Sequence, residues 1–239
     1  MVSASKFEYL KNNLNEMAEL CLEQVIQLTD ALERDDYELA AHVIERDDLI
    51  DELEKENDNL SQNAILEAVA SLNDMQKQAD AEEVALKNDP LRFALSAIRI
   101  TRYFERIGDN VVNCARAFRN EAIRKEIFVK DQDLSQILPR VVTIMGMAVE
   151  SLVEEKDRFY GSVQKVEDEL DRHVTSFYHR SLDDDTMSRR EFADLYRINT
   201  SPERQGDLAV NIAMELVRLT TGRDIRHLFP SMSKLLHTT

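Results

Sequence analysis

The chain has 239 residues, 43% of them hydrophobic, which is enough to bury the core of one large domain or of two small ones. Its formal net charge is −16, and its lysines and arginines form no stripe, so nucleic acid and anionic membrane surfaces are disfavoured as partners. With only 5 glycines and 4 prolines, the composition favours an all-α protein.

Three features of the sequence predict a soluble cytoplasmic protein. The two cysteines, Cys21 and Cys114, form no CxxC pair and no disulfide framework, which suits a reducing compartment. The N-terminal residues contain no apolar segment typical of a secretory signal. The longest mostly apolar run, residues 141–149, is too short to span a bilayer.

Apolar residues at three-and-four spacing predict three helices in the first half of the chain. They span about 5–32, 37 to beyond 60, and 90–126. Asp89 is the expected N-cap of the third helix, with Pro90 at its first position. Residues 70–88 are irregular and are interpreted as an excursion at the tip of a hairpin.

The second half repeats this plan. Its predicted helices span about 134–155, 160–180 and 189–221. A turn is expected at 182–188, an interruption at Pro202 and a C-cap at Gly222. The sequence therefore predicts an all-α fold of two tandem three-helix bundles, six long antiparallel helices in all, with units 1–128 and 129–239.

A short segment occurs once in each unit, and most of its matched residues are polar. The two copies are ERIGDNVVN at 105–113 and ERQGDLAVN at 203–211, which match at six positions with a constant offset of 98 residues. A repeat that only filled a core would match in apolar positions, so the repeat indicates that one polar structure is built twice.

Each copy of this segment contains two carboxylates one helical turn apart, and the preceding helix of each unit offers a second such pair. The pairs on the second helices of the two units align at an offset of 120 residues, 22 more than the offset of 98 between the repeated segments. The same 22 residues separate the two hairpin lengths, which are 54 residues from Asp51 to Glu105 and 32 from Asp171 to Glu203. Antiparallel helices then bring four carboxylates together in each unit. The expected groups are Asp47, Asp51, Glu105 and Asp109, and Glu167, Asp171, Glu203 and Asp207.

Carboxylates at such short distances repel one another unless a cation neutralises them. Bridging carboxylates suit clusters of Fe, Mn, Zn or Mg. The groups are therefore candidate metal sites. Spacing alone is weak support, because acids one turn apart arise by chance and usually solvate a helix face. Asp48, Glu52 and Asp168 compete for the same role.

A glycine stands between the glutamate and the aspartate of each copy, at Gly108 and Gly206. Glycine inside a helix costs about 1 kcal/mol relative to alanine. Its presence in both copies indicates close approach, either by a ligand or by a neighbouring helix.

With these motifs, the chain resembles the PhoU family of phosphate-specific transport accessory proteins over essentially its whole length. The segment DPLRFALSAIRITRYFERIGDNVVNCA is the most similar part. The resemblance implies multinuclear metal sites at the eight carboxylates named above. It further implies a negative regulator of phosphate uptake and starvation signalling that acts between a phosphate ABC transporter, through its ATPase, and a sensor histidine kinase. It would reach the membrane only through partners, and a homodimer is expected.

The second unit departs from the family pattern at two positions. Gln205 stands where the first unit has Ile107, and Pro202 comes directly before Glu203. The second metal site is therefore expected to be the less secure one. The insertion near 70–88 is also longer than the family pattern predicts.

Three other functions remain as alternatives. A di-iron oxidase needs a Glu-x-x-His motif, which the sequence lacks. A histidine phosphotransfer module needs an exposed helical histidine, for which His42 and His173 are candidates. A metal-free helical adaptor shares every expectation except ion binding. No activated nucleophile or phosphate loop is present, so no enzymatic activity is expected.

Overall fold

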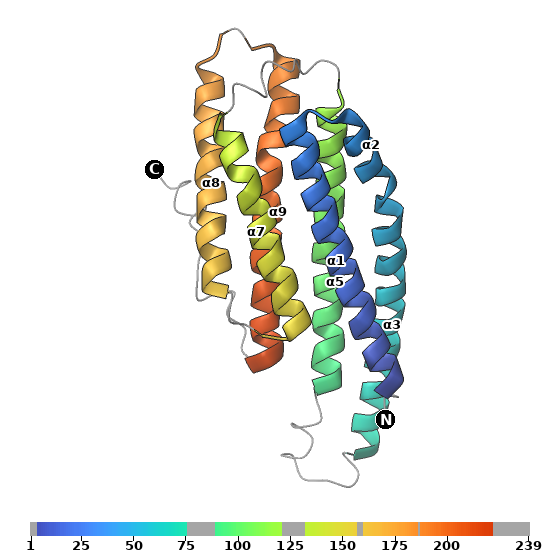
Figure 1. Ribbon diagram of the computed structural model, residues 1–239. Coiled ribbons are helices and arrows are strands. Elements are labelled where there is room, and N and C mark those ends of the chain that lie inside the picture. The colour runs from blue at the N-terminus through green and yellow to red at the C-terminus, as the bar shows by residue number, and fades with distance from the viewer. Residues whose placement is uncertain (1–3, 76–88, 121–131, 157–159, 186, 222–239) are drawn as a thin grey trace.

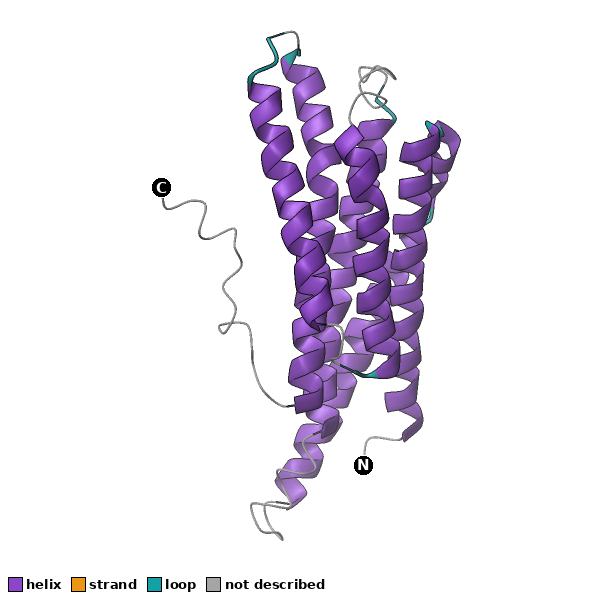
Figure 2. Ribbon diagram, turned by 60° about the vertical axis from the view of Figure 1, so that its left-hand side comes forward, coloured by secondary structure: helices purple, strands orange, loops and turns teal. Residues whose placement is uncertain are grey.

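The computed structural model describes residues 4–75, 89–120, 132–156, 160–185 and 187–221. Within these ranges every regular element is a helix (Figures 1 and 2). The helices are α1 (Ala4–Arg34), α2 (Tyr37–Glu45), α3 (Asp47–Met75), α5 (Asp89–Phe118), α7 (Gln132–Glu154), α8 (Tyr160–Leu182) and α9 (Arg189–Thr221). The predicted all-α fold is confirmed, because long amphipathic stripes with few glycines or prolines bury their apolar faces against one another.

The predicted second helix is divided in two, because α2 ends at Glu45 and α3 begins at Asp47. The first residues of the stretch predicted to be irregular, 70–75, continue α3 as helix. Helix α5 ends at Phe118, so the third helix stops earlier than predicted, because residues 119 and 120 are not helical. The remainder of the irregular stretch, residues 121–126, Gly222 and the 128/129 boundary lie outside the described residues. The division into units 1–128 and 129–239 thus stays a prediction.

The predicted interruption at Pro202 is wrong, since α9 continues through it as one helix. Proline removes one backbone N–H, which is a loss that tertiary packing can offset. Pro202 is buried, and α9 packs against α5, α7 and α8. The Ser201 hydroxyl donates to Asn110 Oδ1 of α5 at 2.6 Å, and the Gln205 amide donates to the same atom at 3.3 Å, so α9 is bound to α5 just before and just after the proline.

The packing of the helices follows the internal repeat. Helices α1, α3 and α5 contact one another in the first half, as do α7, α8 and α9 in the second. Across the seam between the halves, α1 packs against α7 and α5 against α9, side by side at the centre of Figure 1. Each seam contact thus joins a helix to its own counterpart, as in a two-fold symmetric dimer.

Two turns also repeat. Asp35 follows α1 with a φ of 56°, and Glu155 follows α7 with a φ of 51°. Left-handed backbone after a helix closes its last turn, and here the Asp36 and Lys156 N–H groups bond back to Ala31 and Ser151 carbonyls at 2.9 and 3.0 Å. The two positions are 120 residues apart, the offset of the candidate carboxylates on the following helices.

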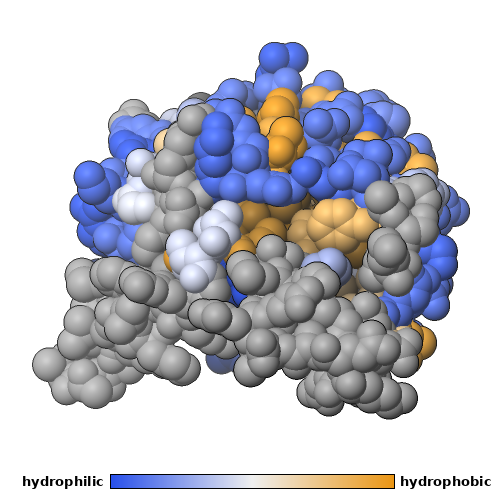
Figure 3. Space-filling view, turned by 90° about the horizontal axis from the view of Figure 1, so that it is seen from below, coloured by the Kyte–Doolittle hydropathy of each residue, from blue (hydrophilic) through white to orange (hydrophobic). Residues whose placement is uncertain are grey.

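One continuous apolar core runs through both halves. Its fully buried large side chains include Phe104, Phe118, Ile144 and Met145. Seen from below, some apolar surface lies exposed between the polar helix faces (Figure 3). By length and composition, one segment of the described residues, 134–154, could cross a membrane, but half of it is buried in the bundle, as in a core helix of a soluble protein.

Candidate metal-binding carboxylate sites

The first carboxylate group lies where α3 packs against α5. Asp47 begins α3, and Asp51 follows one turn later. Burial raises the pKa of the half-buried Asp47, and the negative charges of Asp51 and Asp109 raise it further. Because these charges act on one another across the two helices, the structure brings three of the four predicted carboxylates of this group within electrostatic reach.

Glu105, the fourth member, lies beside Asp109 on α5. Burial raises its pKa, and Asp109 and Glu54 of α3 add to the effect. Arg102 opposes this shift and also pairs with Glu54. The sequence reasoning did not include Glu54, which extends the acidic surface one turn further along α3.

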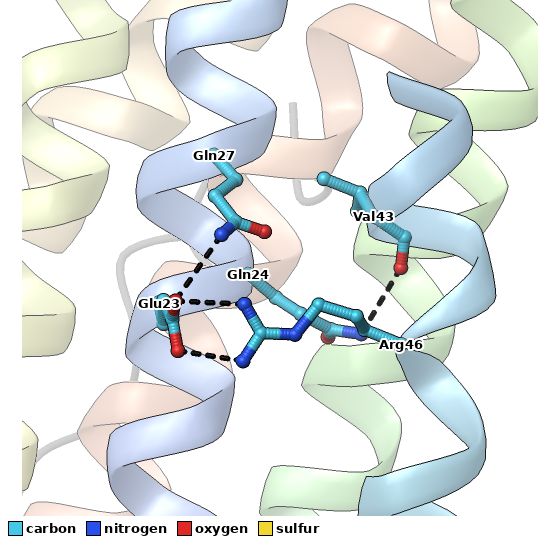
Figure 4. Close-up of polar contacts among 5 residues, drawn as sticks. All are labelled: Glu23, Gln24, Gln27, Val43 and Arg46. Carbon is cyan, nitrogen blue, oxygen red and sulfur yellow. Dashed lines mark hydrogen bonds and ion pairs between the residues drawn. The ribbon is translucent and has the colours of Figure 1, made fainter. Parts of the chain in front are cut away.

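Helix α1 holds the break between α2 and α3 in place (Figure 4). Arg46, at the break, donates two hydrogen bonds of 2.7 Å to the carboxylate of Glu23 on α1. The buried Gln24 amide lies 3.4 Å from both Val43 O and Asp47 Oδ1. These contacts fix the start of α3, and with it the position of Asp47.

The second group lies where α8 packs against α9, and its carboxylates are more deeply buried. Glu167 is 2% exposed. Burial raises its pKa to about 8, together with the charges of Asp171, Asp207 and Asp168. Gln164 donates to Glu167 Oε2 at 3.0 Å. A carboxyl group in this setting holds its proton at neutral pH unless a cation replaces it.

Burial also raises the pKa of the other three members of the second group, and the neighbouring acids add to this shift at Glu203 and Asp171. Burial raises the pKa of Glu203 to about 7, with contributions from Asp207 and Asp171. Burial and Asp207 raise the pKa of Asp171. The pKa of Asp207 is raised by burial and lowered by a hydrogen bond with Glu167 and by Arg106 of α5. All four predicted carboxylates of this unit therefore act on one another.

The carboxylates approach one another without enclosing a common point. In the part of the chain that the structure describes, no three Asp, Glu, His or Cys side chains are placed to hold one ion. Like charges spread apart when nothing neutralises them, so this arrangement is the one expected of mutually repelling acids. As a donor set, four carboxylates on two facing helices fit a hard cation once their side chains turn inward.

The two motif glycines are explained by helix packing beside the candidate sites. A Cβ at Gly108 would lie 3.1 Å from Asp47 Oδ1 and 3.3 Å from Ile50 Cδ1. At Gly206 it would lie 2.6 Å from Leu170 Cδ1 on α8. Glycine thus lets α5 and α9 approach the helices that carry the partner carboxylates, and of the two expectations the neighbouring helix is the one observed.

Two glutamines that the sequence places at unusual positions support the candidate sites. Gln24 is a polar residue on the apolar stripe of α1, between Cys21 and Leu28. Gln205 was a departure from the pattern, and in the structure it is buried and donates to Ser201 Oγ at 2.9 Å and to Asn110 Oδ1 at 3.3 Å. Its place in the repeat thus serves the contact between α5 and α9.

The cysteines and one histidine are core residues. Cys21 and Cys114 are free and buried, and burial raises the pKa of the Cys114 thiol to about 12, so neither is an activated nucleophile. His173 is 6% exposed, with Nε2 3.0 Å from Asn199 Oδ1. This burial is unlike the exposed histidine that phosphotransfer requires.

Comparison with known proteins gives relatives of one family along nearly the whole chain. The family model of the PhoU domain matches residues 14–118. A phosphate-specific transport system accessory protein PhoU homolog of Clostridium acetobutylicum is 24% identical over 225 residues, covering 92% of this chain and 95% of that protein. PhoU homolog 1 of Thermotoga maritima is 25% identical over 221 residues, covering 91% and 88%.

Solved structures have the same fold. The phosphate transport system regulatory protein PhoU of Streptococcus pneumoniae has a TM-score of 0.70 at 19% identity, covering 91% of this chain and 96% of that one. PhoU of Pseudomonas aeruginosa has a TM-score of 0.63 at 21% identity, covering 92% and 99%. These proteins are named as accessory or regulatory proteins, in agreement with the prediction of a non-enzymatic chain. Residues 14–118 of this chain thus match the PhoU domain, and nearly the whole chain is similar to PhoU proteins.

Proposed function

We propose that this chain is a non-enzymatic accessory protein of a phosphate transport system that restrains phosphate uptake and phosphate-starvation signalling. The match of residues 14–118 to the PhoU domain supports this role. So do the names of the two relatives, which this chain matches over most of their length. The helical bundle offers long faces on which partner proteins can dock.

The two carboxylate groups are proposed to be metal sites. The observation that carries this proposal is the second group, in which four acidic side chains from two packed helices lie together. The charges of Asp171 and Asp207 there raise the pKa of both Glu167 and Glu203. A bound cation would balance these negative charges. Asp47, Asp51, Glu105 and Asp109 would hold one multinuclear cluster, of iron or of Zn, Mn or Mg, and Glu167, Asp171, Glu203 and Asp207 the other.

A metal bound by these residues would join helices that are otherwise linked by packing and by a few polar contacts, such as Arg102 with Glu54 and His173 with Asn199. Asp47 and Asp51 come from α3, and their partners come from α5. The second group likewise draws on α8 and α9. Ligation of both helices of each pair would fix their relative position, so that metal content sets the shape of the docking faces.

The proposed partners are the ATPase of a phosphate ABC transporter and a sensor histidine kinase, with this chain as a cytoplasmic adaptor between them and a homodimer as its proposed assembly. It would meet the membrane only through those partners. The net charge of −16 supports contacts with basic protein surfaces rather than with anionic lipid.

Two measurements test the proposal. Elemental analysis of protein purified without chelator should find a transition metal or magnesium in fixed ratio to the chain. Deletion of the gene in its source organism should raise phosphate-starvation gene expression at high phosphate. Unchanged expression would contradict the regulatory role, whereas metal-free protein with intact regulation would contradict only the metal sites.

A metal-free helical adaptor is the second candidate function. The observation in its favour is that, among the described residues, no three possible ligands stand ready around one point. In that case the carboxylate groups would serve as acidic docking surfaces. Loss of regulation on removal of the acids without any change in metal content would support this candidate.

A further inference from the structure

A cavity of about 370 Å³ lies on the seam between α5 and α9. Its lining consists of residues that occupy equivalent positions in the two copies of the repeat. The pairs are Arg106 and Arg204, Asp109 and Asp207, Asn110 and Leu208, and Asn113 and Asn211. Each pair is separated by 98 residues, so the cavity lies on the internal pseudo-two-fold axis of the chain.

The cavity accounts for the part of the repeat that the carboxylate groups leave unexplained. Packing explains the glycines, and the candidate metal sites use the glutamates and aspartates. The matched arginines and asparagines have neither role. Arg106, Arg204, Asn113 and Asn211 make no hydrogen bond or ion pair within the described part of the chain, and all four line the cavity.

We infer that this cavity binds a tetrahedral dianion of the sulfate or inorganic phosphate class. Each guanidinium presents five N–H donors in a planar fork that matches the oxygens of such an anion, and each asparagine amide adds two donors. Two guanidinium groups facing one cavity balance two negative charges, which favours a dianion over a carboxylate. The cavity is large enough to hold the anion with bridging water.

The two aspartates on the wall determine how strongly the anion binds. With Asp109 and Asp207 ionised, the four charged side chains of the lining sum to zero. Neutralising the aspartates leaves two positive charges in the cavity. Anion affinity therefore rises when these aspartates are neutralised, by substitution or by a cation. The inference needs no metal, but if the proposed metal sites exist, anion and metal binding reinforce one another.

Calorimetric titration of the full-length protein with sodium phosphate and sodium sulfate, at constant ionic strength and with EDTA present, tests the inference. Both anions should bind, whereas sodium acetate should not. The double variant Arg106→Gln/Arg204→Gln should bind about tenfold or more weakly, because it loses two charge-assisted contacts. The control Arg119→Gln/Arg190→Gln removes the same charge from two exposed arginines outside the cavity, one just after α5 and one in the first turn of α9, and should bind as the native protein does.

A third variant gives a gain of binding that loss of folding cannot imitate. Asp109→Asn/Asp207→Asn should bind phosphate about tenfold more tightly than the native protein, since it removes the opposing charges. It should also lose metal, whereas Arg106→Gln/Arg204→Gln should keep its metal. The two proposals therefore fail separately.

Three results would overturn the inference. One is the absence of phosphate or sulfate binding by both the native protein and Asp109→Asn/Asp207→Asn. Another is equal loss of binding in the cavity variant and its arginine control, which would indicate non-specific charge attraction. The third is acetate binding as tight as phosphate binding, because it would exclude recognition of a dianion.

Discussion

Arg99 on α5 and Glu215 on α9 form an ion pair across the seam, with Arg99 Nη1 3.2 Å from each carboxylate oxygen. Glu215 is 1% exposed, and the Ser96 hydroxyl at 3.4 Å and Arg218 at 3.8 Å complete its surroundings. A buried carboxylate that loses its partner is destabilised by the full free energy of desolvation. The pair therefore makes the contact between the halves specific.

The variant Arg99→Leu should lower the free energy of unfolding by about 2 kcal/mol, which is less than a fully orphaned charge costs because Arg218 remains. Urea unfolding followed by circular dichroism measures this loss. Arg34→Leu, which breaks the exposed pair with Asp30, is the control and should cost less than about 0.5 kcal/mol. Equal midpoints for the two variants would show that the seam pair adds no stability.

Glycine-to-alanine changes should have opposite signs at two helical positions. Gly146→Ala in α7 meets no atom within 4 Å and should stabilise the protein by about 0.5–1 kcal/mol through helix propensity. Gly206→Ala would place its Cβ 2.6 Å from Leu170 Cδ1, which is buried in the core. Overpacking should outweigh propensity there and destabilise by about 1 kcal/mol. Thermal unfolding of both variants checks this; stabilisation at both positions would contradict the close packing of α8 and α9.

The helices were predictable because each buries one stripe, and a 3.6-residue period is visible in any single segment. Two local features were not. Arg46 divides the predicted second helix although its backbone, at φ −80° and ψ −8°, stays in the helical region. Pro202 leaves α9 intact. Both features depend on contacts with other helices. Arg46 pairs with Glu23 of α1, and the helix around Pro202 is hydrogen-bonded to α5.

Helical spacing also predicted which acids of the candidate sites share a helix face, but it did not predict their contacts with other helices. Spacing places Glu203 and Asp207 on one face, and the hairpin brings that face to α8. Spacing says nothing of side chains from the other half of the chain. The action of Arg106 on Asp207 across the seam arises from the packing of α5 on α9, which local sequence does not encode.

Stability without metal should fall as pH rises. Glu203 has a pKa of about 7 in the folded state and about 4.5 unfolded, so between these values the folded state binds more protons. Stability is thus full below about pH 4.5 and declines up to about pH 7. In EDTA, Glu203→Gln should match the native protein near pH 5 and exceed it at pH 8 by on the order of 2 kcal/mol, reduced for partial exposure.

Urea unfolding in EDTA at pH 5 and at pH 8 measures this pH effect. The variant Glu52→Gln is the reference, because Glu52 is exposed on α3. That variant should follow the native protein at both pH values. If Glu203→Gln also shows no pH-dependent difference, burial does not perturb this carboxylate.

Metal addition should distinguish two neighbouring pairs of acids on α3. Saturating Mn²⁺ or Zn²⁺ should raise the melting temperature of the native protein by about 5–10 °C, the shift expected for roughly 3 kcal/mol of linkage at 100 times Kd. Asp47→Asn/Asp51→Asn should lose part of this shift. Asp48→Asn/Glu52→Gln removes the same charge from an exposed face and should retain it. Equal losses would indicate diffuse attraction of cations to an acidic helix.

The seam cavity has a consequence for the ancestry of the chain. Each half supplies one arginine, one aspartate and one asparagine from the same positions of its own repeat. A single three-helix protein with this segment, before gene duplication, could form the complete cavity only by associating with a second copy of itself. Fusion of two such copies would make that association permanent and would leave the two walls free to differ, as they do at Asn110 and Leu208.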